Sequence, residues 1–204
     1  MAIALDTTTT GSGGTSWSHT CTGSNLILWV HTFGGTSAVT YNSVSMISAG
    51  TVASGAGRAS TELWYLVNPA TGSNTITLTG GSGNGAASYT GAKQTGQLDS
   101  TNTSTVGTAQ SSITISTTVV DANSWLVIAT ADGQGGETGG TGTTIRRLNA
   151  NGLALADSNA GLGAGSRSLQ VVFGGSSTTS AGVIASFKPS IDVANIPDAR
   201  VFFM

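Results

Sequence analysis

His19 and Cys21 are the residues whose types and spacing come nearest to catalytic chemistry. They stand two positions apart, so on a strand their imidazole and thiol would share one face. A cysteine beside a histidine that a third group orients is an arrangement for nucleophilic hydrolysis. The alternative is a strand histidine beside a small buried cysteine. The acidic residues are isolated and no Gly-x-Ser-x-Gly turn occurs, so we expect a protein that is not an enzyme.

Asp132 and Glu137 enclose the glycine-rich segment Gly-Gln-Gly-Gly, which follows an apolar run. Two carboxylates and free carbonyls in a flexible loop are oxygen ligands of the kind that Ca²⁺ takes. The loop lacks the denser Asp spacing of a dedicated calcium loop, so a solvated loop is the alternative. The two histidines and one cysteine fall short of a zinc ligand set. We therefore expect no cofactor, with calcium at Asp132 and Glu137 as the candidate exception.

Trp17 is the candidate platform for a bound sugar. Sandwich modules stack sugars on aromatic rings, with polar side chains for the hydroxyl groups. The other three tryptophans lie inside apolar runs that are typical of a core, whereas Trp17 has Ser16 and Ser18 as neighbours. Packing in the core is the alternative for Trp17 as well.

The low charge of the chain excludes several classes of partner. Only 7 Lys and Arg residues and 9 Asp and Glu residues are present, and the net charge is −2. Seven scattered cations cannot form the basic footprint that neutralises phosphates, so no nucleic-acid partner is expected. The longest apolar runs have about five residues, far short of a membrane span. Residues 1–10 contain no Lys or Arg, so we expect no secretory signal and synthesis in a host cytoplasm.

The elements that must position these residues are strands, because apolar residues alternate along most of the chain. Gly, Ser and Thr account for 89 of the 204 residues, and glycine-rich turns separate the alternating runs. We predict an all-β fold, a two-sheet antiparallel sandwich of jelly-roll type with about a dozen short strands and no substantial helix. The expected strands are 2–5, 15–20, 25–33, 39–46, 60–67, 74–79, 87–92, 112–119, 124–131, 143–149, 168–174 and 182–188.

One domain is expected over residues 15–189, because no linker or change of composition interrupts them. An N-terminal arm, 1–14, and a C-terminal arm, 190–204, would flank it. The C-terminal arm follows Pro189 and ends on large apolar groups that need a covering surface. It either folds back on its own sandwich or docks on a neighbouring subunit. We expect partner contacts from Ile196, Val201, Phe202, Phe203 and Met204.

Several segments resemble a β-sandwich module of tailed-phage virion proteins and of surface proteins of environmental bacteria. These segments are Ser-His-Thr-Cys-Thr-Gly-Ser-Asn at 18–25, Val-Thr-Tyr-Asn-Ser-Val-Ser-Met at 39–46, Glu-Leu-Trp-Tyr-Leu-Val-Asn-Pro-Ala-Thr-Gly at 62–72, Lys-Gln-Thr-Gly-Gln-Leu-Asp at 93–99 and Ala-Ser-Phe-Lys-Pro at 185–189. The resemblance covers about residues 15–189 and implies a jelly-roll-like sandwich used for display, capping or adhesion. It carries no catalytic residues.

These observations predict a non-enzymatic structural protein of a phage particle, a capsid decoration or tail-associated protein located in the virion. Its expected partners are copies of itself and other virion proteins such as the major capsid protein. We expect the copies to form a closed ring, a trimer. The alternative is a carbohydrate- or receptor-binding module of a fibre or cell surface. A hydrolase would require His19, Cys21 and an acid to meet in one pocket.

Overall fold

The structure is a computed structural model that describes residues 1–54, 58–149, 152–177 and 179–190. Within these residues it contains seventeen strands, four antiparallel sheets and no helix, which confirms the all-β, sandwich-like class. The strands are β1 (Ala4–Thr10), β2 (Ser16–Cys21), β3 (Ile27–Phe33), β4 (Ala38–Tyr41), β5 (Val44–Ser45), β6 (Ile47–Ser54), β7 (Arg58–Val67), β8 (Gly72–Thr79), β9 (Ser82–Thr90), β10 (Leu98–Val106), β11 (Gln110–Val119), β12 (Trp125–Ala131), β13 (Thr138–Gly139), β14 (Thr144–Asn149), β15 (Leu153–Asp157), β16 (Gly165–Ser177) and β17 (Ser180–Phe187). The described part of the chain offers no helix long and apolar enough to cross a membrane.

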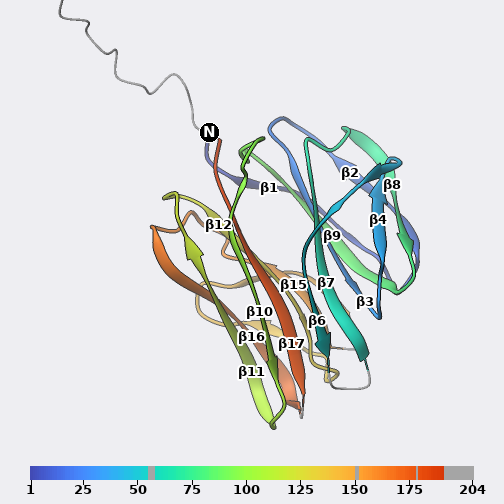
Figure 1. Cartoon of the computed structure of the whole chain (residues 1–204), viewed down its shortest axis with the longest axis vertical. Helices are drawn as coiled ribbons and strands as arrows, with labels where there is room; N and C mark the ends of the chain where they lie inside the picture. The colour runs from blue at the N-terminus through green and yellow to red at the C-terminus, as the bar shows by residue number, and fades with distance from the viewer. Residues whose placement is uncertain (55–57, 150–151, 178, 191–204) are drawn as a thin grey trace, which may run out of the picture.

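The strands form two sandwiches, one from each half of the chain (Figure 1). The N-terminal sandwich has an inner sheet with the strand order β1-β9-β3-β7-β6 and an outer sheet with the order β2-β8-β4-β5. The C-terminal sandwich has an inner sheet, β10-β17-β12-β15-β14, and an outer sheet, β11-β16-β13. The four sheets replace the two that the sequence predicted, because the inner sheets are covered on both faces.

The two sandwiches have the same strand order, except that β5 has no counterpart, and their inner sheets start in the same register. Ile27 of β3 stands opposite Tyr89 of β9, and Trp125 of β12 stands opposite Phe187 of β17 in the same way. Both edge strands also bulge at an aspartate, β1 between Leu5 and Thr7 and β10 between Leu98 and Ser100. Since strand order, register and bulge all recur, the chain is a structural duplication of one sandwich.

The largest apolar cluster lies between the two inner sheets and joins the sandwiches. Trp29, Tyr65 and Tyr89 of the first inner sheet pack with Trp125 and Phe187 of the second. Two further clusters fill the interiors of the N-terminal and C-terminal sandwiches. The inner strands are therefore apolar on consecutive positions, which is the pattern of strands buried on both faces.

The expected N-terminal arm forms a strand of the inner sheet. Residues Ala4–Thr10 pair with β9 as strand β1, because the β-branched run Thr7–Thr10 fits an edge strand. The amino group of Met1 donates a hydrogen bond to the carbonyl oxygen of Ser190 at 2.8 Å, so the described chain starts and ends at one edge of the molecule (Figure 1). The predicted partner residues Ile196, Val201, Phe202, Phe203 and Met204 lie outside the described residues.

Candidate functional site

His19 lies at the centre of a buried polar cluster between β1, β2 and β9. Its Nδ1 is 2.9 Å from Thr9 Oγ1 and its Nε2 is 3.0 Å from Ser88 Oγ. Ser88 Oγ in turn donates to Asp6 Oδ2 at 2.7 Å. Burial lowers the pKa of His19 to about 4, although the charge of Asp6 acts in the opposite direction. The imidazole is therefore neutral at physiological pH.

The cluster is arranged for packing and not for nucleophilic attack. Cys21 is fully buried, and burial raises the pKa of its thiol, which keeps it protonated and unreactive. The hydroxyl of Ser88 donates its hydrogen bond to Asp6, so it does not donate one to the imidazole. The sequence hypothesis placed His19, Cys21 and an acid in one pocket. The structure buries His19 and Cys21 fully and places the acid, Asp6, at a partly exposed position beside them.

The C-terminal sandwich repeats this cluster without a histidine or a cysteine. Ser186 Oγ donates to Asp99 Oδ2 at 3.0 Å, as Ser88 does to Asp6. Ser100 Oγ lies 2.6 Å from Thr117 Oγ1, which has the place of the His19 ring. Although burial alone would raise the pKa of Asp99, hydrogen bonds from its neighbours lower it overall. In both sandwiches the cluster joins the bulged edge strand to the outer sheet, through the His19 imidazole in one and the Thr117 hydroxyl in the other.

Asp132 and Glu137 are brought together in the loop between β12 and β13. Their exposed fractions are only 1% and 2%. The backbone N–H of Gln134 donates to Asp132 Oδ1 at 2.6 Å. Burial, reinforced by the charge of Asp132, raises the pKa of Glu137 to about 7. No group of three or more His, Cys, Asp or Glu side chains in the described ranges is placed to hold a metal ion, so calcium at this pair would need backbone carbonyls.

Trp17 lies on the inward side of β2 and is only half-buried. A Cβ at Gly83 would stand 2.3 Å from the Trp17 ring, so the ring lies directly on this glycine. Ile115 packs on Gly182 at the equivalent place in the C-terminal sandwich. The ring thus has a packing role at a core position, and the face over Gly83 is closed to a sugar.

A buried ion pair within the C-terminal sandwich accepts a hydrogen bond from the N-terminal sandwich, and the sequence analysis missed this contact. Asp157 on β15 accepts hydrogen bonds from Arg146 Nε at 2.6 Å and from Arg146 Nη2 at 2.9 Å. Tyr89 Oη, from the N-terminal sandwich, donates to the same carboxylate at 2.6 Å. Burial, and then the charge of Asp157, raises the pKa of Tyr89 well above its ordinary value. No spacing in the sequence connects these residues, because they come from three strands.

The outward faces of both outer sheets are covered with hydroxyl groups and lack charged side chains at their outward strand positions. The exposed side chains are Ser16, Ser18, Thr20, Thr75, Thr77 and Thr79 in one sandwich and Thr114, Ser116, Thr118, Ser166 and Ser168 in the other. Short hydroxyl side chains on a pleated sheet give an even, uncharged surface.

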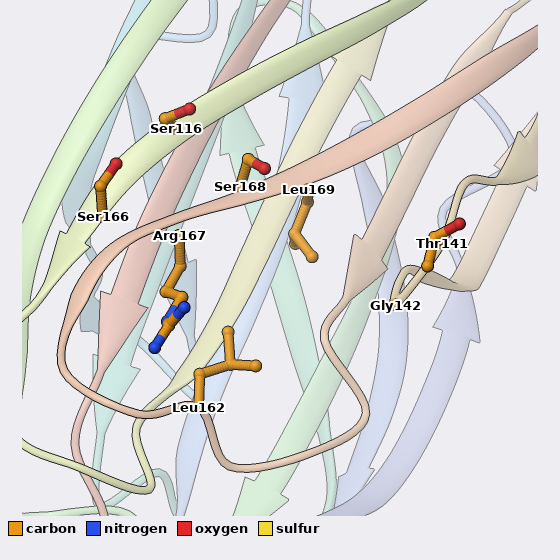
Figure 2. Close-up of a pocket in the computed structure, with 8 residues that line it drawn as sticks. All are labelled: Ser116, Thr141, Gly142, Leu162, Ser166, Arg167, Ser168 and Leu169. Carbon is orange, nitrogen blue, oxygen red and sulfur yellow. The ribbon is translucent and has the colours of Figure 1, made fainter.

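A hollow of about 300 Å³ lies at one side of β16 in the C-terminal sandwich. Arg167, Leu162 and Leu169 line it together with the turn that contains Thr141 and Gly142 (Figure 2). Figure 2 shows these side chains on one side of β16, with Ser116, Ser166 and Ser168 on the other. Sequence reasoning did not single out Arg167, because a lone arginine in a Ser-rich strand carries no motif.

Comparisons of the chain with protein-family models, with curated proteins and with solved structures found no match.

Proposed function

We propose that this chain is a non-enzymatic structural protein of a phage particle, a capsid decoration or tail-associated protein that assembles as a homo-oligomer. The observation that carries the proposal is the build of the folded body. Two sandwiches are joined through a shared apolar cluster, and their outer sheets carry rows of short hydroxyl side chains. A body whose described outward strand positions carry no charged side chain suits display on the surface of a particle.

The interior of the molecule supports a mechanical role. Three apolar clusters and the hydrogen bond from Tyr89 to Asp157 join the four sheets into one body. His19 itself is fully buried, and its polar cluster recurs without the histidine in the second sandwich. A protein held in many copies gains its binding strength from repeated contacts, so no single contact needs to be strong.

The test is the oligomeric state of the full chain and of a chain that ends at Ser190. Ending there keeps the hydrogen bonds of Ser190 to Gly91 and Met1, so the folded body is not disturbed. We expect the full chain to form a homo-oligomer by native mass spectrometry and to enter particles, and the shortened chain to do neither. Equal thermal unfolding of the two proteins is the control for folding. Unchanged assembly after the deletion would refute the role of the C-terminal segment.

The alternative function, a glycan- or receptor-binding module, is supported by the rows of hydroxyl groups on the outer sheets. Such rows offer donors and acceptors to a polysaccharide without an aromatic platform. Binding on a glycan array that is lost when Thr75 and Thr77 are both changed to Val would favour this alternative over the structural role.

A further inference from the structure

Because the two sandwiches are duplicates, a position filled by a side chain in one and left as a hollow in the other indicates what the hollow could bind. Tyr41, at the end of β4, is fully buried in the N-terminal sandwich. Its ring packs edge-on to His19, with the centroids 6.4 Å apart. The hydroxyl oxygen lies 3.1 Å from the carbonyl oxygen of Ala70 and accepts a hydrogen bond from Asn74 Nδ2 at 3.3 Å. Tyr41 thus closes the space beside β8.

The C-terminal sandwich lacks the hairpin that carries this ring. Strand β4 continues to Tyr41, which pairs with Ile76 of β8. Its counterpart β13 ends at Gly139, and the chain turns back at once, since the N–H of Thr143 donates to the carbonyl of Gly140 at 3.0 Å. Leu169, which has the register position of Ile76, therefore has no strand partner from β13.

Arg167 stands at the register position of Asn74. Asn74 donates to the carbonyl of Thr71 in the preceding turn, and Arg167 Nε donates to the carbonyl of Gly163 at 2.8 Å in the equivalent turn. Both turns lead into a glycine with positive φ, Gly72 and Gly165. The C-terminal sandwich thus has a charged donor, Arg167, at the position of Asn74, but it has no ring at the position of Tyr41.

By strand register, the hollow beside β16 corresponds to the place of the Tyr41 ring beside β8, because its lining residues Thr141, Leu169 and Arg167 stand at the positions of Tyr41, Ile76 and Asn74. It is lined by Leu162, Leu169, Arg167 and the turn at Thr141, and by the hydroxyl side chains of Ser116, Ser166 and Ser168 (Figure 2). Its volume of about 300 Å³ is at the small end of ligand sites. The partly exposed Leu162 gives an apolar edge that suits a ring, above the nearly buried Leu169. A guanidinium stacks on aromatic faces or donates to a ring oxygen.

We propose that this hollow is a binding site for a single phenol ring, either a free phenol or the side chain of a tyrosine. The ring contacts Leu162 and Leu169, and its oxygen accepts a hydrogen bond from Arg167. The site does not depend on the structural role proposed above.

Titration of the full chain with p-cresol, followed by NMR chemical shifts, tests the proposal. We expect saturable shifts at the hollow with a roughly millimolar dissociation constant, which is ordinary for so small a ligand. Cyclohexanol, which has the hydroxyl but no flat ring, should bind at least about tenfold more weakly. N-acetyltyrosinamide is the second probe: its binding identifies a tyrosine side chain as the source, and binding of p-cresol alone identifies a free phenol.

The variant Thr141→Tyr supplies the missing ring from the turn itself. We expect it to raise the melting temperature and to abolish p-cresol binding, whereas Thr75→Tyr, the same change on the exposed face of β8, leaves binding unchanged. Arg167→Ala should weaken binding several-fold. The proposal is overturned if p-cresol gives no saturable shifts, if cyclohexanol binds as well as p-cresol, or if Thr141→Tyr binds p-cresol as the unchanged protein does.

Discussion

Replacement of Glu137 by Gln should stabilise the protein at neutral and alkaline pH. Burial and the charge of Asp132 raise the pKa of Glu137 from 4.5 to about 7. The folded protein therefore holds a proton that the unfolded chain releases, so the free energy of unfolding contributed by Glu137 falls as pH rises from about 4.5 to 7. A shift of this size corresponds to ~3 kcal/mol at 1.36 kcal/mol per pKa unit.

Urea unfolding of both proteins, followed by tryptophan fluorescence between pH 4.5 and 8, measures the effect. The difference in unfolding free energy should be near zero at pH 4.5 and should reach ~3 kcal/mol in favour of Glu137→Gln at pH 8. Titrating groups that do not interact with Glu137 cancel in this difference, so the difference reports the coupled pair of Glu137 and Asp132. Calcium at pH 8 should stabilise only the protein with Glu137 if the pair binds the ion.

Glu62→Gln is the matched control. Glu62 is also buried, but its carboxylate accepts hydrogen bonds from Thr32 Oγ1 at 2.8 Å, from the N–H of Gly35 at 3.2 Å and from Ser60 Oγ. The same substitution there turns an amide donor toward these donors and should destabilise the protein by about 1–3 kcal/mol. A Glu137→Gln difference that does not change with pH would refute the assignment of a buried, proton-holding carboxyl.

Three further predictions concern buried polar groups. Asp157→Ala should lower the unfolding free energy by about 3–5 kcal/mol in urea, because it leaves the Arg146 guanidinium and the Tyr89 hydroxyl without their shared acceptor; a loss below about 1 kcal/mol would contradict a buried pair. His19→Thr should remove ~3 kcal/mol of stability loss between pH 6.5 and 4, because the pKa of His19 is lowered to about 4 and only the unfolded chain takes up a proton on this histidine in that range; an unchanged acid limb of the pH profile counts against it. Tyr41→Phe should cost about 1 kcal/mol by thermal unfolding while keeping the ring in place; a neutral result would show that the hydroxyl bonds add nothing.

The alternation of apolar residues predicted most strands. Besides β6 (Ile47–Ser54) and the short β13 (Thr138–Gly139), it missed β10 (Leu98–Val106), in which six of nine residues are Ser, Thr or Asn and which lies at a sheet edge. It also missed β15 (Leu153–Asp157), a short strand whose five residues are all buried. Hydrophobic period fails for β10 and β15, because the first has few apolar residues and the second has no polar face.

The duplication had a signal in the sequence that strand patterns do not use. Leu-Asp-Thr-Thr at 5–8 corresponds to Leu-Asp-Ser-Thr at 98–101, and Ala-Ser-Tyr at 87–89 corresponds to Ala-Ser-Phe at 185–187. Comparing the chain with itself would have found these pairs. The hollow beside β16 could not be predicted in this way, since it results from a hairpin that one half lacks.

The sequence predicted that Asp132 and Glu137 lie in one loop, and they do. It did not predict that both side chains are buried, because the surrounding fold buries them. For Trp17 the flanking serines indicated exposure, although the ring packs on Gly83 from a strand much later in the chain. Contacts between distant strands thus decided what each of these side chains does.

The mass of the full chain in solution, compared with that of the chain ending at Ser190, tests the structural role most directly. Native mass spectrometry should show a closed oligomer of the full chain and a folded monomer of the shortened one. A full chain that stays monomeric at the concentrations where the particle would assemble contradicts the proposal that this protein works by fastening to its own copies.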